Sequence, residues 1–223
     1  MCQLSCTMYP FLFFDLDGTL TESGPGIIHA LGRAFRQMGL ESRMPADMRP
    51  FIGPPLRDSL EAFCGITGKE ADRFIRLYRR AYEEEGILKG DPYAGIPELL
   101  RQLGEAGYTL CTATSKMRDV AVLVLEKYAL APCFAVIGGG EVAEGQDKAA
   151  VIRRTLETAG ARPADTLMIG DRKYDVLGAR ACGMDCVGVL YGYGDRKELE
   201  AAGAKYIVSS VDELSRLLLG RGL

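Results

Sequence analysis

The sequence predicts an α/β fold in which helices cover both faces of a parallel sheet and a helical segment follows the first strand. Short apolar segments alternate with segments of helical periodicity along most of the chain, which indicates right-handed crossovers and a three-layer parallel sheet. One long segment shows helical patterns only, which indicates an insert. With 223 residues, 48% of them hydrophobic, the chain is long and apolar enough for a core domain carrying a smaller insert.

The first strand is predicted at residues 11–14, because Phe-Leu-Phe-Phe is short, aromatic and uniformly apolar, as in a strand buried on both faces. Further strands are expected at residues 108–113, 134–137, 166–169, 186–190 and 206–208. Helices are expected at residues 96–105, 119–128, 148–158, 174–181, 197–201 and 211–218. Ligands of such sheets bind beyond the carboxyl ends of the strands, so the residues there are the first candidates for a site.

The insert lies between Leu20 and Pro92, where the sequence has no strand pattern. Helical patterns are clearest at residues 26–38, 56–63 and 69–85. The segment is too long to be a loop. We therefore predict a core of residues 1–20 and 93–223 and a helical cap of residues 21–92.

The composition excludes several classes of function. A net charge of −3 argues against binding to a nucleic-acid polymer, and no apolar run approaches the 18 residues of a membrane-spanning helix. The first basic residue is Arg33 and the seven cysteines show no Cys-x-x-Cys spacing, so we expect reduced thiols and a cytoplasmic protein. His29 is the single histidine, so catalysis by paired histidines is excluded. If the protein is an enzyme, we expect it to use carboxylates and a metal.

Asp15 and Asp17 directly follow the first predicted strand, in the pattern Asp-x-Asp-Gly-Thr. Two carboxylates this close repel one another, which raises a pKa unless a cation balances them. Mg²⁺ prefers oxygen ligands of this kind. A capped turn is the structural alternative, but at average residue usage the pattern occurs by chance in roughly one chain of this length in a thousand.

Three further groups of polar residues lie at or near other strand ends. Thr114 and Ser115 follow the strand predicted at residues 108–113, where hydroxyl groups suit phosphate oxygens or cap a helix. Lys148 begins a predicted helix, where a cation opposes the helix dipole, so a site role competes with a surface ion pair. Asp171 and Asp175 follow the strand predicted at residues 166–169, in the pattern Gly-Asp-x-x-x-Asp, and offer further oxygen ligands.

In this order, the four groups resemble the motifs of the haloacid dehalogenase superfamily over nearly the whole chain. The resemblance implies a Rossmann-like core, in agreement with the alternation above, and identifies the insert as a helical cap. It also implies phosphoryl transfer with Mg²⁺. Asp17 argues against dehalogenation, because the dehalogenases that resemble this chain lack that second carboxylate. The Lys-Thr-Gly-Thr sequence of the transport ATPases is absent.

Transferred position by position, the resemblance makes Asp15 the nucleophile that forms an aspartyl-phosphate. Asp17 would protonate the leaving alcohol and then deprotonate the hydrolytic water. The phosphoryl oxygens would be held by Thr114, by the amide of Ser115 and by Lys148.

The resemblance also implies a set of Mg²⁺ ligands. Asp15, the backbone carbonyl of Asp17 and Asp171 would bind the metal, with Asp175 as a supporting or water-mediated ligand. Mg²⁺ and Lys148 would then surround the equatorial oxygens of the transition state with positive charge.

Residues 51–57 and 188–194 resemble the branch that holds phosphoglycolate phosphatases and 5′-nucleotidases, and residues 168–214 look closest to the 5′-nucleotidases. Arg57 in the cap is the candidate for a substrate carboxylate or second anion, with a solvated arginine at a helix start as the alternative.

The expected function is therefore a Mg²⁺-dependent phosphatase that acts on a small phosphorylated metabolite, with nucleoside 5′-monophosphates as first candidates. Phosphoglycolate phosphatase and sugar phosphomutase remain open as alternatives, and a non-catalytic protein on the same fold is a third class. We expect a monomer or homodimer with no membrane or nucleic-acid partner.

Overall fold

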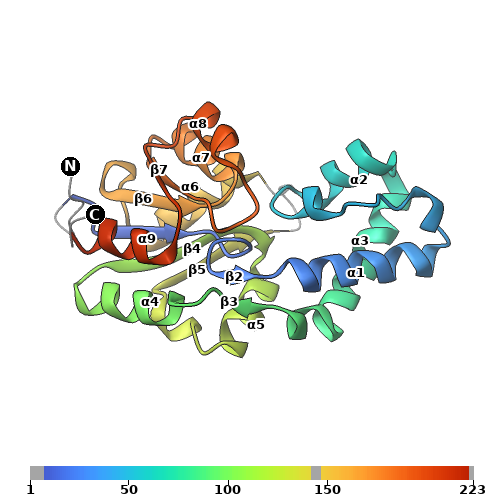
Figure 1. Ribbon diagram of the computed structural model, residues 1–223, viewed down its shortest axis with the longest axis horizontal. Coiled ribbons are helices and arrows are strands. Elements are labelled where there is room, and N and C mark those ends of the chain that lie inside the picture. Colours follow the sequence, from blue (N-terminus) through green and yellow to red (C-terminus); the bar gives the residue numbers. More distant parts are fainter. Residues whose placement is uncertain (1–7, 142–146, 221–223) are drawn as a thin grey trace. The chain divides into compact units, whose positions relative to one another are not determined.

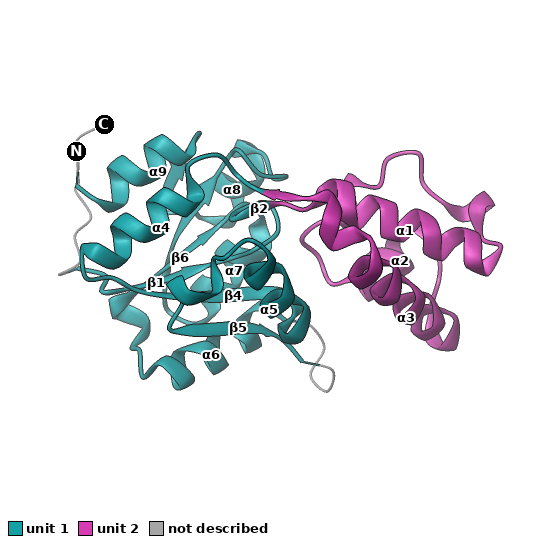
Figure 2. Ribbon diagram, turned by 90° about the horizontal axis from the view of Figure 1, so that it is seen from below, with its two compact units in different colours: residues 1–21, 92–223 teal, residues 22–91 magenta. Residues whose placement is uncertain are grey.

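The computed structural model describes residues 8–141 and 147–220. The chain divides into two compact units, one formed by Met1–Thr21 and Pro92–Leu223 and the other by Glu22–Asp91 (Figure 2). Each unit is described by itself below. None of the helices in the described residues combines the length and apolar character that a membrane crossing needs.

The first unit is built on a six-stranded sheet in the order β5-β4-β1-β6-β7-β8 (Figure 1). The strands are β1 (Phe11–Phe14), β4 (Thr109–Met117), β5 (Val136–Gly140), β6 (Thr166–Gly170), β7 (Asp185–Val189) and β8 (Tyr206–Val208). Every neighbouring pair is parallel, with Phe14 beside Thr112 on β4 and Ile169 on β6. The parallel α/β fold predicted from the sequence is confirmed.

Helices cover both faces of this sheet (Figure 1). They are α4 (Ile96–Glu105), α5 (Arg118–Lys127), α6 (Lys148–Ala159), α7 (Lys173–Ala181), α8 (Arg196–Ala202) and α9 (Val211–Leu218). On one face, α6, α7 and α8 pack over a buried cluster that includes Phe13, Met168 and Cys186. The neighbours of Phe13 on β1, Leu12 and Phe14, are fully buried on the opposite face because side chains alternate along a strand.

Two strand ends differ from the prediction. The strand expected at residues 108–113 continues as β4 to Met117, with a shift of its register against β5 between Ala113 and Met117. The polar residues Thr114–Lys116 therefore belong to the strand itself. They ended the apolar pattern because their side chains are polar, although Thr114 and Met117 are buried. β5 likewise continues through Gly138, where a Cβ would lie 2.0 Å from Thr155 Oγ1.

The second unit is helical, with α1 (Gly24–Met38), α2 (Leu56–Cys64) and α3 (Gly68–Glu84). The rings of Phe35 and Phe74 join α1 to α3 edge to face, with their centroids 4.7 Å apart. Two very short strands, β2 (Thr21–Glu22) and β3 (Asp91–Pro92), pair where the chain leaves the first unit and returns to it. The sequence analysis missed them because two residues are too few to form a pattern.

Candidate active site

The turn after β1 places Asp15 and Asp17 at the carboxyl edge of the sheet. The amide of Asp15 donates to the carbonyl of Ile169 at 2.9 Å, so Asp15 continues the pairing of β1 with β6. Gly18 adopts a φ of +85°, which an L side chain rarely takes, and its amide donates to the carbonyl of Thr21 at 2.8 Å. The result is a tight turn that keeps both carboxylates beyond the strand. Asp15 is only 4% exposed.

Lys148, the first residue of α6, joins the carboxylates of two separate motifs. Its Nζ lies 2.9 Å from Asp15 Oδ1 and 2.7 Å from Asp175 Oδ1, and it donates to the carbonyl of Ala113 at 3.0 Å. Burial alone would lower the pKa of Lys148, but the two carboxylates outweigh it and the pKa is raised. Lys148 therefore remains a buried ammonium group, not a surface ion pair.

Three buried carboxylates lie close to one another here, and Lys148 contacts two of them. Asp15, Asp171 and Asp175 each offer an oxygen within 4.8 Å of the other two. Burial, reinforced by its two carboxylate neighbours, raises the pKa of Asp171 well above its usual range. Burial also raises the pKa of Asp175 to about 6, although Lys148 opposes the shift. One ammonium group does not balance three carboxylates, and an all-oxygen donor set of this kind fits a hard divalent cation such as Mg²⁺.

A loop after β7 holds Asp171 in place. The amide of Tyr193 donates to Asp171 Oδ2 at 2.8 Å, and the hydroxyl of Thr19 donates to its Oδ1 at 3.4 Å. A Cβ on Gly192 would lie 2.4 Å from the Cβ of Asp171, and a Cβ on Gly194 would lie 2.0 Å from its carbonyl oxygen. The sequence analysis did not include this loop in the site. The signal was the repeated Tyr-Gly of residues 191–194, since glycine permits such a close approach.

The ring of Tyr191 is also part of this support. Its hydroxyl donates to the carbonyl of Thr19 at 3.1 Å, and its ring meets that of Tyr93 edge to face, with centroids 5.0 Å apart. Burial raises the pKa of Tyr191, so it stays a neutral hydrogen-bond donor. Tyr191 thus links the loop after β7 to the turn after β1.

The end of β4 supplies the hydroxyl group predicted for phosphate. Thr114 is buried, and it follows Ala113, whose carbonyl accepts a hydrogen bond from Lys148. Its Oγ1 accepts a hydrogen bond from the amide of Lys116 at 3.2 Å. Ser115, between them, is partly exposed.

Lys116 makes a contact that the sequence analysis missed. Its Nζ lies 3.0 Å from Asp17 Oδ2. The signal was the two-residue period of a strand, which places Thr114 and Lys116 on one side. Because the strand was expected to end at residue 113, this period was not applied to Lys116.

Arg57 lies in the second unit, at the start of α2, where it pairs with Asp72 on α3. Its guanidinium group lowers the pKa of Asp72. Half of the Arg57 side chain is exposed. Its role toward a substrate stays a prediction.

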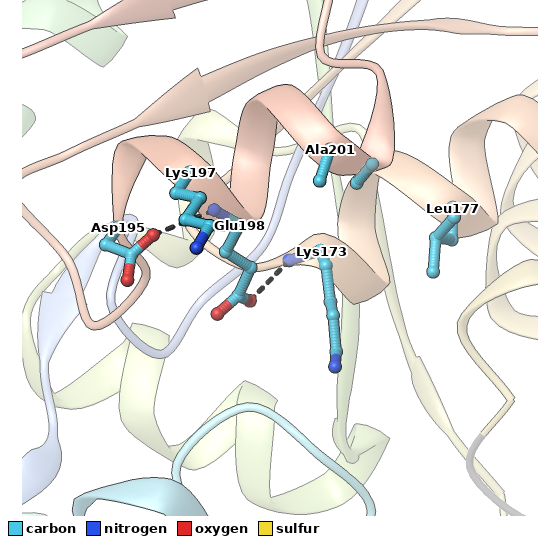
Figure 3. A pocket seen from close by; sticks show the side chains of 7 residues that line it. Lys173, Leu177, Asp195, Lys197, Glu198 and Ala201 are labelled. Atoms are coloured by element: carbon cyan, nitrogen blue, oxygen red, sulfur yellow. Dashed lines mark hydrogen bonds between the residues drawn. The ribbon is translucent and has the colours of Figure 1, made fainter.

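A shallow groove of about 480 Å³ runs along α7 and α8 (Figure 3). Its lining residues are Lys173, Leu177, Asp195, Lys197, Glu198, Ala201 and Ala202. Glu198 accepts hydrogen bonds from the amide of Lys173 at 2.8 Å and from Arg172 Nε at 2.9 Å. The groove therefore borders the start of α7, the helix that carries Asp175, and contains none of the clustered carboxylates.

Gly178 on α7 gives a test of how tightly Lys148 is held. A Cβ there would lie 2.7 Å from Lys148 Cγ and 3.3 Å from the amide nitrogen of Ala149. Alanine gains up to about 1 kcal/mol in helix propensity, but such overpacking costs about 1–3 kcal/mol. We expect Gly178→Ala to lower the free energy of unfolding by roughly 1 kcal/mol and to reduce turnover by displacing Lys148.

Gly104 on α4 is the matched control, because nothing lies within 4 Å of a Cβ there. Gly104→Ala should raise the free energy of unfolding by about 0.5–1 kcal/mol and leave turnover unchanged. Urea unfolding of both variants checks the expectation. Equal stabilisation by the two substitutions would contradict it and would show that the residues around Lys148 can rearrange to make room for a methyl group.

Comparison with known proteins gives a family match over most of the chain. Residues 12–189 match the family model described as haloacid dehalogenase-like hydrolase. A 5′-nucleotidase of Pseudomonas aeruginosa is 35% identical over 211 residues, which cover 94% of this chain and 96% of that protein.

Two further relatives carry different names. The tyrosine-protein kinase PtkA of Mycobacterium tuberculosis is 32% identical over 93% of this chain and 72% of its own length. A phosphoglycolate phosphatase of Aquifex aeolicus is 29% identical over 82% of this chain and 85% of its own. Among solved structures, a predicted phosphatase from Clostridium acetobutylicum superimposes with a TM-score of 0.88 at 36% identity and covers 94% of this chain and 97% of its own.

Proposed function

Because this chain belongs to the haloacid dehalogenase-like hydrolases and is a phosphoric monoester hydrolase, we propose that it cleaves a small phosphomonoester through a phosphoryl group carried on Asp15. The observation that supports the proposal most strongly is the position of Asp15. This carboxylate is buried at the carboxyl edge of the central strand, beside the ammonium group of Lys148 and close to Asp171 and Asp175.

Asp15 would act as the nucleophile on phosphorus. Lys148 fixes Asp15 Oδ1 at 2.9 Å, which orients the carboxylate, and its positive charge lies where the phosphoryl oxygens would come. The hydroxyl of Thr114 and the amide of Ser115 would donate to the same oxygens. Attack by a carboxylate divides a difficult hydrolysis into two easier steps, the formation and the hydrolysis of an acyl phosphate.

Asp17 would move the protons of both steps. In the first it would give a proton to the oxygen of the departing alcohol, and in the second it would take one from the attacking water. Its Oδ1 is buried and accepts no hydrogen bond within the described residues, so this oxygen is available to hold a proton.

The donor set fits Mg²⁺, which would be held by Asp15, the backbone carbonyl of Asp17 and Asp171, with Asp175 in support. When bound, Mg²⁺ supplies charge stabilisation to the phosphoryl oxygens in the transition state. The carboxylate of Asp171 is already oriented by its neighbours, because Thr19 and the amide of Tyr193 each donate to one of its oxygens.

For the substrate, we propose a nucleoside 5′-monophosphate. The name of the Pseudomonas aeruginosa relative, which aligns over almost the whole of both chains, supports this class. Phosphoglycolate is the second candidate, on the name of the Aquifex aeolicus relative, and Arg57 would then be the cation for its carboxylate.

A panel of phosphomonoesters tests the substrate class. Phosphate release with Mg²⁺ is measured from AMP, GMP, IMP, phosphoglycolate and hexose phosphates and ranked by kcat/KM. We expect a nucleotide to lead. If phosphoglycolate leads and Arg57→Met removes its advantage, the nucleotide proposal is wrong. Turnover stimulated by a sugar bisphosphate with little phosphate release would instead indicate a mutase.

A further inference from the structure

Lys116 and Asp17 form a sheltered ion pair at the carboxyl edge of the sheet. Lys116 Nζ lies 3.0 Å from Asp17 Oδ2, and the two side chains are only 7% and 13% exposed. An ion pair this far removed from water holds its geometry more firmly than a surface pair, which solvent screens. A charged group in such a place is also costly unless paired, so the contact is a specific feature of the fold.

The pair engages only one oxygen of the Asp17 carboxylate. Oδ2 faces Lys116, whereas Oδ1 is buried and accepts no hydrogen bond from the described part of the chain. A carboxylate fixed through one oxygen cannot rotate freely, so the position of the other oxygen is fixed as well. A buried acceptor without a partner destabilises a fold, which indicates that Oδ1 is kept open for a reacting group.

The local structure explains how Lys116 reaches Asp17. β4 lies beside β1, and its register against β5 shifts between Ala113 and Met117, the segment that contains Lys116. The amide of Lys116 is tied to Thr114 Oγ1 at 3.2 Å. One strand end therefore carries both the hydroxyl predicted to hold phosphate and the ammonium group that holds Asp17.

We propose that Lys116 is a positioning residue for Asp17: it holds Oδ2 so that Oδ1 is presented to the leaving group. The proposal rests on the proposed function, in which Asp17 is the acid of the first step. Two sheltered lysines then have separate roles, since Lys148 orients the nucleophile Asp15 and Lys116 orients the proton donor Asp17. Lys116 would act only through Asp17.

Leaving-group dependence tests this role, with benzyl phosphate and 4-nitrophenyl phosphate as the probes. Benzyl alcohol leaves poorly unless it receives a proton, whereas 4-nitrophenolate leaves as an anion. Lys116→Met should lower kcat/KM for benzyl phosphate by about 100-fold and for 4-nitrophenyl phosphate by less than about 5-fold. A role in folding or in phosphate binding would lower both values equally. Lys116→Arg, which keeps the charge, should recover part of the loss.

Three further variants make the outcome decisive. Asp17→Asn should show the same selective loss, and adding Lys116→Met to it should cost less than about 3-fold more, because the lysine acts through the missing acid. Lys127→Met, at an exposed lysine of α5, controls for the loss of a positive charge. Circular dichroism and thermal melting confirm that each variant is folded.

The outcomes separate the two proposals. If Asp17→Asn is selective for benzyl phosphate but Lys116→Met lowers both esters equally or neither, the inference about Lys116 is wrong and the role of Asp17 stands. A loss from Lys116→Met that persists in the Asp17→Asn background would show that the lysine acts on the substrate itself. If Asp17→Asn shows no selectivity, the acid role in the proposed function fails, and the inference fails with it.

Discussion

Asp15→Asn is expected to lower the rate of phosphate release by at least about 10⁴-fold and to leave the protein folded. An amide oxygen is a far weaker nucleophile than a carboxylate oxygen, so the acyl phosphate cannot form. The substitution keeps the shape of the side chain, and an amide oxygen can still accept from Lys148 Nζ, which lies 2.9 Å from Asp15 Oδ1.

The loss is measured as phosphate release from the best substrate of the panel, with circular dichroism and urea unfolding as controls of the fold. The variant has one buried negative charge fewer beside Asp171 and Asp175, so its free energy of unfolding should not fall greatly. Turnover within about tenfold of the wild type, in a preparation free of contaminating phosphatase, would mean that another group attacks phosphorus.

Removal of divalent cations is the second change with a large expected effect. EDTA should abolish phosphate release, and excess Mg²⁺ should restore it. The physical reason is the imbalance of three buried carboxylates and one ammonium group in the cluster of Asp15, Asp171, Asp175 and Lys148. Without a further cation, the negative charge of a phosphomonoester would add to a cluster in which three carboxylates already outnumber the ammonium group of Lys148.

Thermal melting provides a readout independent of turnover. A ligand at about 100 times its dissociation constant stabilises the folded state by about 2.7 kcal/mol, so Mg²⁺ should raise the melting temperature of the EDTA-treated protein. Asp171→Asn, which removes a proposed ligand, should abolish that rise. Full activity in EDTA, or an equal rise with Asp171→Asn, would contradict the assignment of the metal site.

The central strand and the carboxylates were predictable because their signals are local. The apolar run at residues 11–14 followed at once by Asp15 and Asp17 marks both a buried strand and its polar end, and the same holds for β6 and Asp171. Parallel strands bring their carboxyl ends to one edge, so two distant motifs were expected to meet. The cluster of Asp15, Asp171 and Asp175 follows that expectation.

The contacts that orient these residues were not predictable, because they depend on tertiary neighbours. Lys116 follows Thr114 on a strand whose polar end looks like a loop in the sequence, and its contact with Asp17 arises across two strands. The loop of residues 191–194 is similar: two tyrosines after a strand usually only pack, and its place against Asp171 depends on how closely Gly192 and Gly194 approach. The pattern of neighbouring residues in the sequence shows neither the contact of Lys116 with Asp17 nor the approach of the two glycines to Asp171.

The most direct test of the proposed chemistry is to find the phosphoryl group on Asp15. The wild type and the Asp17→Asn variant, whose second step should be slow, are mixed with 4-nitrophenyl phosphate and Mg²⁺ and quenched in acid within one turnover. Borohydride reduction then marks any acyl phosphate, and mass spectrometry locates it in the tryptic peptide that ends at Arg33. We expect a mark at Asp15 that is stronger in Asp17→Asn and missing in Asp15→Asn. Release of 4-nitrophenol at the normal rate with a mark on another residue, or with none on Asp15 in either protein, would contradict it.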